Sequence, residues 1–195
     1  MQYPLQLRFK LLAIASQIYI SEPDGDLVFY VKQKAFKLKE DITVFGDEAQ
    51  SRPLYHIKAD RIIDWSANYH FTDAQGQPAG GVKRHGMKSI WKANYDISDQ
   101  DGQVLMTITE ENPWIKVLDA LLSEIAIVGL LVGYFLHPSY LITTSGGEPV
   151  MRLKKVRSLV ERRFEIDKLA EMQPHDEARA VLGALMMILL ERGRG

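Results

Sequence analysis

The 195 residues carry 24 Lys and Arg against 25 Asp and Glu, a formal net charge of −1, which argues against a dedicated nucleic-acid binder because such binding depends on a basic surplus. There is no cysteine, so disulfides, thiolate metal sites and cysteine nucleophiles are excluded, and a reducing cytoplasm is the expected location. With 46% hydrophobic residues, we expect one globular domain over residues 1–195 with a substantial buried core.

The N-terminal segment is predicted to be a strand and not a signal peptide. Its apolar run, Leu11–Ala15, is five residues long, short of the roughly 7–15 that the hydrophobic region of a signal peptide needs. Gln17–Ile20 then continues with a strand-like pattern that runs into a turn.

The next hundred residues alternate between turns and short strand-like segments. Turns are predicted at 23–26, 45–47, 73–76 and 99–102, where Gly stands beside Asp side chains that can bond their own backbone. The clearest strand places five apolar residues on one face: Ile63, Trp65, Ala67, Tyr69 and Phe71. Segments 91–97 and 104–109 alternate in the same way. Many short strands with hairpin turns predict a sandwich or a barrel.

The alternation stops at Asn112-Pro113, a pair suited to the cap and first position of a helix, so we expect a helical insertion near 113–136. Val117–Leu136 is long enough to suggest a membrane span. Asp119 and Glu124 interrupt it, however, and an Asp near the centre of a span costs about 2.5–3.5 kcal/mol. We therefore expect a docked segment that does not cross the membrane.

Strand patterns resume over Ser139–Thr143, Val150–Val156 and Leu159–Ile166, and a helix is expected over about 175–191. Its part Ala180–Leu190 is apolar on every side. Such a helix must be buried on every side, and at ~1.5 Å per residue this segment spans only about half of a ~30 Å hydrocarbon core. The strands are therefore expected to wrap it.

Four segments resemble the tubby-like superfamily, which includes the tubby C-terminal domain, the phospholipid scramblases and the LURP-one-related proteins: Phe29–Lys34, Glu40–Val44, His137–Ile142 and Arg163–Ile166. The chain is most similar to the LURP-one-related branch. The resemblance implies a mainly β fold, a closed antiparallel barrel of about twelve strands around the C-terminal helix. It also implies a non-enzymatic module, without a cofactor, that binds a ligand or anionic phospholipid head groups.

Two other functions remain open at this point. One is a scramblase-like membrane-associated protein, although the chain lacks the scramblases' cysteine cluster, and Phe164–Glu171 offers few of the six to eight oxygens that Ca²⁺ takes. The other is a small-molecule enzyme with its site in loops at the end of the barrel.

Basic residues form the candidate site for anionic lipid or phosphate: Lys83, Arg84, Lys88, Lys92, Lys32 and Lys34. In the tubby branch, basic residues on the barrel wall bind phosphoinositide head groups, so the resemblance implies such a role here. A third basic cluster lies within 152–157. For any one cluster we favour the alternative, in which Lys and Arg cover the solvated faces of strands. The partners considered are an anionic membrane lipid, which would hold the protein at the membrane periphery, or another protein; the oligomeric state is left open.

No catalytic or metal-binding residue is predicted. Gly81–Ser89 resembles a phosphate-binding loop, but Met87 separates the second glycine from the lysine, and a strand follows where a helix is required. The five histidines lack the spacing of metal ligands. No Gly-x-Ser-x-Gly motif is present.

Overall fold

A computed structural model describes residues 1–11, 15–34, 41–60, 67–84, 94–111, 139–156, 158 and 162–192. Within these residues, twelve strands precede one helix. The strands are β1 (Leu5–Leu11), β2 (Ala15–Ser21), β3 (Leu27–Lys34), β4 (Asp41–Phe45), β5 (Pro53–Ala59), β6 (Asn68–Asp73), β7 (Pro78–Arg84), β8 (Asn94–Ser98), β9 (Val104–Glu110), β10 (Ser139–Thr144), β11 (Pro149–Val156) and β12 (Arg162–Lys168). The helix is α3 (Pro174–Arg192).

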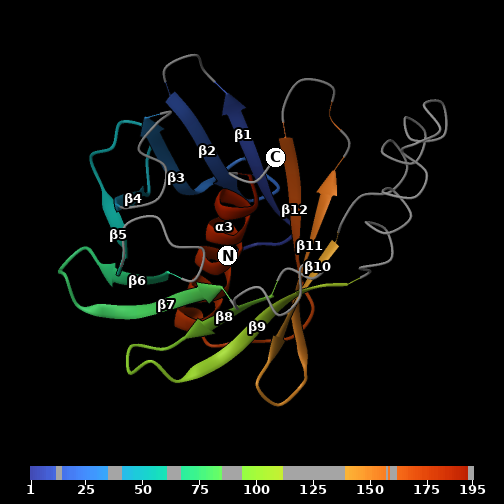
Figure 1. Ribbon diagram of the computed structural model, residues 1–195. Coiled ribbons are helices and arrows are strands. Elements are labelled where there is room, and N and C mark those ends of the chain that lie inside the picture. The colour runs from blue at the N-terminus through green and yellow to red at the C-terminus, as the bar shows by residue number, and fades with distance from the viewer. Residues whose placement is uncertain are drawn as a thin grey trace, which may run out of the picture.

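The strands form a closed antiparallel barrel (Figure 1). Each strand pairs with its neighbours in the sequence, and β1 pairs with β12 to close the ring. Closure leaves no unpaired sheet edge. The predicted barrel of about twelve strands around a C-terminal helix is therefore confirmed. The helical insertion expected near 113–136 lies outside the described residues.

Alternation along the strands decides which side chains face the interior. In β6, Tyr69 and Phe71 are buried while His70 between them is exposed. In the same way Tyr95 and Ile97 of β8 are fully buried. The period-2 pattern in the sequence thus predicted the core face of these strands correctly.

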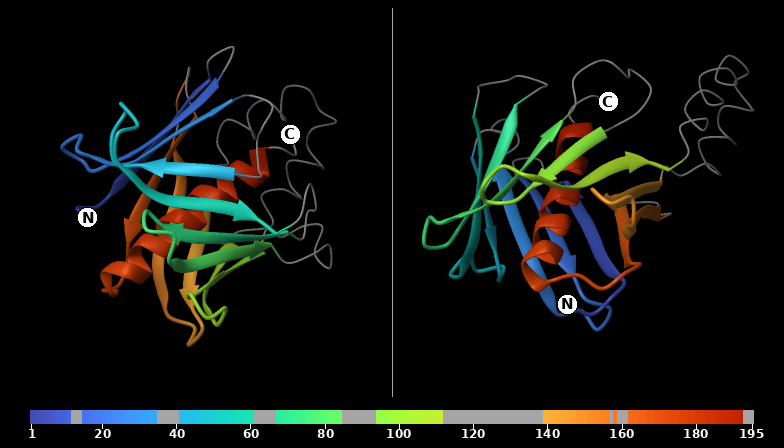
Figure 2. Two further views of the ribbon diagram at one scale, coloured as in Figure 1. Left: turned by 90° about the vertical axis from the view of Figure 1, so that its left-hand side faces the viewer. Right: turned by 90° about the horizontal axis from the view of Figure 1, so that it is seen from below.

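Helix α3 runs through the interior of the barrel (Figure 2). It begins at Pro174, whose missing N–H costs nothing at a first helical position, and Asp176 and Glu177 lie in its first turn near the positive end of the helix dipole. Every residue from Glu177 to Leu190 is buried or nearly so. The expected bounds of about 175–191 agree with the observed Pro174–Arg192.

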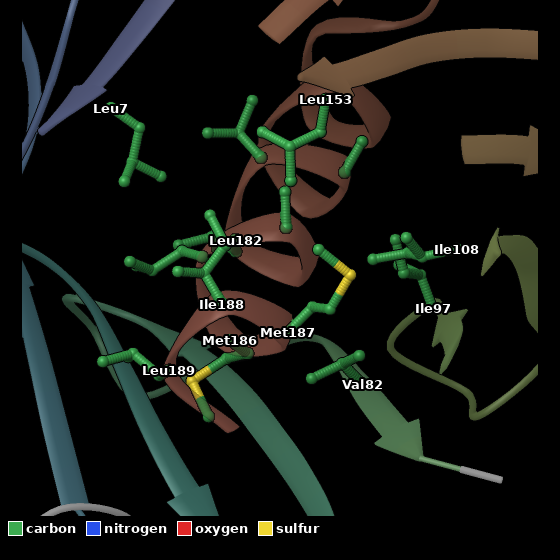
Figure 3. Close-up of a cluster of buried hydrophobic side chains, with 14 of the residues drawn as sticks. Leu7, Val82, Ile97, Ile108, Leu153, Leu182, Met186, Met187, Ile188 and Leu189 are labelled. Atoms are coloured by element: carbon green, nitrogen blue, oxygen red, sulfur yellow. The ribbon is translucent and has the colours of Figure 1, made fainter. Parts of the chain in front are cut away.

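The core side chains of α3 point to several sides of the barrel. Figure 3 shows Met187 directed toward Ile97 and Ile108, and Leu189 directed to another side of the helix. At Gly183 the helix approaches β8 so closely that an added Cβ would lie 2.6 Å from Ile97 Cδ1. A helix apolar all round is stable here because strands surround it.

Arg179 fixes the N-terminal part of α3 to the barrel. Its buried guanidinium donates three hydrogen bonds of 2.6 Å, to the Ala79 carbonyl, to Asp176 Oδ1 and to Gln100 Oε1. Gly80 beside it has φ +135°, and an added Cβ would lie 2.5 Å from the Ser98 carbonyl oxygen. Glycine is required at this position because no side chain fits between β7 and β8.

The barrel has two distinct ends, which we name after residues of α3. At the Arg179 end lie the turns that follow β2, β4, β6, β8 and β10, together with the segment from β12 to α3. At the Glu191 end, α3 finishes beside Tyr95 and Arg84, at the start of β8 and the end of β7. The antiparallel order places the last residues of β1, β3, β5, β7, β9 and β11 at this second end.

Candidate functional site

The two ends carry opposite charge within the described residues. The turns at the Arg179 end are rich in carboxylates: Glu22, Asp24, Asp26, Asp47, Glu48, Asp73, Asp99, Asp101, Glu148 and Glu171. The strands at the Glu191 end finish or begin in basic residues: Lys10, Lys32, Lys34, Lys58, Lys83, Arg84, Lys154, Lys155, Arg162 and Arg163. Fewer carboxylates share that end: Asp41, Asp60, Glu110, Glu111 and Glu191. Arg52, Lys168 and Arg179 in turn lie at the Arg179 end. The described residues are therefore polarised in charge, although the net charge of the chain is near zero.

A pocket of about 250 Å³ opens at the Glu191 end, between the last turns of α3 and strands β1, β10, β11 and β12. Its lining combines apolar and charged side chains: Phe9, Tyr140, Lys155, Arg162, Phe164, Met187, Ile188 and Glu191. Phe9, Met187 and Ile188 are buried, whereas Lys155 and Arg162 are exposed. The pocket thus has apolar walls below and two cations near its mouth.

The register explains why charged side chains reach this pocket. Met151, Leu153 and Lys155 alternate along β11 on its inward side, and Lys155 lies opposite Phe164. Arg162 begins β12 opposite Phe9 of β1. Inward positions at either terminus of a strand lie near solvent at the barrel end, where a charge keeps its hydration.

Glu191 is held on one side of the pocket by two groups. The Tyr95 hydroxyl donates a hydrogen bond of 2.6 Å to Glu191 Oε1. Arg84 Nη2 lies 3.7 Å from the same oxygen, and the Arg84 guanidinium carbon lies 5.9 Å from the Tyr95 ring centroid. This arrangement offsets part of the negative charge that Glu191 brings to the pocket.

Tyr140 contributes a phenol that remains protonated at neutral pH. Burial, followed by the nearby Glu110 and Glu191 carboxylates, raises the pKa of Tyr140 well above its usual value. Glu110 lies directly opposite it in the register of β9 and β10 and is itself buried. A protonated phenol can donate a hydrogen bond to an oxygen anion in the pocket.

A second, shallower hollow of about 450 Å³ adjoins this pocket and shares Lys155 with it. Arg152 and Lys154, which also line it, already have carboxylate partners. Arg152 Nη2 lies 2.9 Å from Glu111 Oε1, and Lys154 Nζ lies 2.7 Å from Asp167 Oδ2. These pairs make the two side chains less available to a ligand than Lys155.

The predicted basic residues have different positions. Lys83 and Lys32 are exposed on the outer faces of β7 and β3, with β4, β5 and β6 between those strands. Arg84 is only 12% exposed and faces Glu191 instead of open solvent. Lys34 ends β3, and Lys88 and Lys92 lie outside the described residues. Of the six, the described structure places only Arg84 beside the pocket, and their lipid-binding role stays a prediction.

Sequence reasoning missed Lys155 and Arg162 as pocket residues. Lys155 belongs to the third basic cluster, within 152–157, for which the sequence favours the solvated face of a strand. The missed signal is the phase of the alternation, because Lys155 follows Met151 and Leu153 on the core face. For Arg162 only the pairing of β12 with β1 carries the information, and that pairing joins opposite ends of the sequence.

Two further observations concern the described part of the chain. None of its helices combines the length and apolar character needed to cross a membrane. Over the same residues, no three or more His, Asp or Glu side chains gather in a way that would hold a metal ion.

The family model described as LURP-one-related matches residues 27–170. No curated protein matches the chain. An X-ray structure of a protein from Arabidopsis thaliana is similar over 98% of this chain and 92% of that chain, with 14% sequence identity and a TM-score of 0.49.

Proposed function

This chain belongs to the LURP-one-related family, and we propose that it is a non-enzymatic binding module whose pocket at the Glu191 end takes the head group of an anionic phospholipid. One observation carries the proposal. The 250 Å³ pocket joins apolar walls to two exposed basic side chains, Lys155 and Arg162.

Each part of the pocket suits one part of such a ligand. The Arg162 guanidinium can donate two parallel hydrogen bonds to a phosphate, and Lys155 adds a second cation. Phe9, Met187 and Ile188 supply apolar surface for the glycerol and the first carbons of an acyl chain, where each buried CH₂ contributes about 0.8 kcal/mol. The pocket is slightly smaller than the ~300–1,000 Å³ of sites for drug-sized ligands, so it suits a head group better than a whole lipid.

The charge distribution supports an orientation at a membrane. With the Glu191 end toward an anionic leaflet, basic strand ends would face the surface, each contributing about 1 kcal/mol when close to it. The acidic turns at the Arg179 end would then point away. The protein would lie at the periphery of the membrane, as the sequence predicts, with the pocket facing the lipid.

The test uses a soluble short-chain phosphatidylserine, which forms no charged surface when kept below its micelle concentration. We expect calorimetric titration to show that Lys155→Gln with Arg162→Gln weakens binding at least tenfold. The matched control is Lys32→Gln with Lys83→Gln, which removes the same charge from the outer wall at the same end and should keep wild-type affinity. Equal losses in the two double variants, or no binding by the wild-type protein at low salt, would overturn the proposal.

Vesicle flotation then examines the orientation. Wild-type protein should float with vesicles containing phosphatidylserine and remain unbound with pure phosphatidylcholine. Raising the ionic strength to 1 M shortens the Debye length to about 3 Å and should release the protein. Binding that does not depend on salt or anionic lipid would contradict the assigned role of the basic end.

A further inference from the structure

We propose a second anion site on the outer wall of the barrel, where Arg8 of β1 and Arg163 of β12 together take a phosphate group. A cavity of about 130 Å³ lies between them, lined by Gln6, Arg8, Val156, Arg163, Phe164 and Glu165. Phe164 borders both this cavity and the barrel-end pocket, but the other lining residues differ. The inference does not rest on the proposed function.

The first observation is that two arginines face each other across a strand pair. Arg8 and Arg163 are directly opposite in the register of β1 and β12. Both lie on the outer face, since Leu7 and Phe9 on either side of Arg8 are buried in the core. Like charges directly opposite each other destabilise a sheet, and the register of a closed barrel cannot slip to separate them. A bound dianion would be attracted to both side chains at once.

The second observation is a guanidinium with unused bonding capacity. Arg8 Nε is buried and has no hydrogen-bond partner, an arrangement that costs free energy unless an acceptor is supplied. The Arg8 side chain lies against an aromatic ring, with its guanidinium carbon 5.8 Å from the Tyr19 ring centroid. Lys10 Nζ lies 5.3 Å from the same centroid. Tyr19 therefore holds two cations beside each other on β1.

The Tyr19 ring is itself fixed in place. It is 6% exposed, it packs against Tyr30 at a centroid distance of 5.1 Å, and its hydroxyl lies 3.3 Å from both Gln17 Oε1 and Glu48 Oε2. A rigid aromatic support limits the rotamers of Arg8, so less side-chain entropy is lost when an anion binds.

The charges around the cavity define the ligand class. Arg8, Arg163 and Lys10 are the cations on this face, and Glu165 is the carboxylate in the lining. Lys154, which lies opposite Glu165 in the register of β11 and β12, is paired with Asp167, so Glu165 keeps its charge against the three cations. The remaining positive balance favours a dianion over a monoanion. A volume of 130 Å³ admits one phosphate group with a few waters at ~30 Å³ each, either inorganic phosphate or the phosphomonoester of a lipid such as phosphatidic acid.

The experiment measures phosphate binding by thermal shift and by phosphorus NMR, with ionic strength held constant by chloride. Wild-type protein should be stabilised by millimolar inorganic phosphate. Arg8→Gln and Arg163→Gln should each weaken phosphate binding at least tenfold, and Arg8→Lys should give an intermediate affinity because it keeps charge but loses the guanidinium fork. Lys32→Gln, on the outer face of β3, is the control and should bind as the wild type does.

Vesicles of phosphatidylcholine with phosphatidic acid distinguish the two sources of phosphate. If the lipid is the ligand, Arg8→Gln should weaken flotation and free phosphate should compete. If a soluble phosphate is the ligand, Arg8→Gln should leave flotation unchanged while losing free phosphate. Either result supports the site, whereas wild-type phosphate binding that survives both Arg8→Gln and Arg163→Gln, or absence of wild-type binding, overturns it. All of these measurements are made in a Lys155→Gln with Arg162→Gln background, which removes the cations of the barrel-end pocket and so separates this test from that of the pocket.

Discussion

Gly183 in the middle of α3 offers a strict test of how tightly the barrel closes on its helix. A Cβ added there would lie 2.6 Å from Cδ1 and 2.8 Å from Cγ1 of Ile97, and 3.6 Å from Ile108 Cδ1. Favourable carbon contacts lie at about 3.5–4.0 Å, so the first two are severe overlaps. Ile97 and Ile108 are fully buried, which leaves little free space for either side chain to move into.

Two opposing effects set the size of the change in Gly183→Ala. Alanine is favoured over glycine inside a helix by about 0.8–1.0 kcal/mol, whereas overpacking a dense core costs about 1–3 kcal/mol. We expect overpacking to win and the free energy of unfolding to fall by about 1 kcal/mol, near the middle of the difference. For a protein of this size that corresponds to roughly 2–4 °C in Tm.

The variant Ile97→Val removes Cδ1, the atom that lies nearest to the added methyl group. On its own this truncation should cost about 0.5–1.5 kcal/mol. In the Ile97→Val background, Gly183→Ala should cost less than in the wild type, because the 2.6 Å overlap with Cδ1 is removed while the 2.8 Å overlap with Cγ1 remains. The two substitutions should therefore couple favourably by at least about 0.5 kcal/mol.

Urea unfolding of the four proteins of this cycle, followed by circular dichroism, measures the coupling. The slopes against urea should agree, so that shifts in midpoint report stability alone. Additive effects within about 0.5 kcal/mol would refute the packing argument. So would a Gly183→Ala protein more stable than the wild type, since that would mean that β8 does not press on α3.

Two further predictions concern the N-terminal part of α3 and the outer wall of the barrel. Arg179→Met should lower the free energy of unfolding by about 3 kcal/mol in urea titrations. The reason is that the Ala79 carbonyl, Asp176 and Gln100 lose a buried charged donor. A loss below about 1 kcal/mol would contradict this reasoning. Burial, followed by the Glu48 carboxylate, raises the pKa of Tyr19 to about 12, above the ~10 of an unfolded chain. The stability linked to this proton is complete below pH ~10 and is lost as the pH rises toward ~12. In Tyr19→Phe, the free energy of unfolding measured in urea should therefore fall less steeply between these pH values. The same dependence on pH in the variant and the wild type would contradict the raised pKa of Tyr19.

The local features of the fold were predictable because they depend on residues close in sequence. Ala180–Leu190 has no polar face, and its burial in α3 was confirmed. The alternation in β6, with Tyr69 and Phe71 inward and His70 outward, was confirmed for the same reason. A period-2 or apolar pattern reports the phase of an element directly, without knowledge of its partners.

The period-2 alternation along a strand does not reveal which groups cover its outer face. Tyr19 and Tyr30 face outward, since Ile18, Ile20, Phe29 and Val31 occupy the core, yet the two rings are only 6% and 2% exposed. They are covered because they pack on each other and because Glu48, from the turn after β4, reaches the Tyr19 hydroxyl. The pocket at the Glu191 end depends in the same way on closure between β1 and β12, which no local pattern encodes.

The polarity of charge can be traced to different causes at the two ends. At the Arg179 end, carboxylates form the turns: Asp73 Oδ1 accepts hydrogen bonds from the backbone N–H groups of Gln75 and Gln77, and Asp99 Oδ1 accepts those of Asp101 and Gln103. The acidic residues at this end therefore have a structural role in stabilising the turns. The described structure shows no equivalent backbone role for Lys155 and Arg162 at the Glu191 end, where they line the pocket. Among the described residues these two basic side chains take no part in forming a turn, and for this reason we propose that they serve a ligand at the Glu191 end.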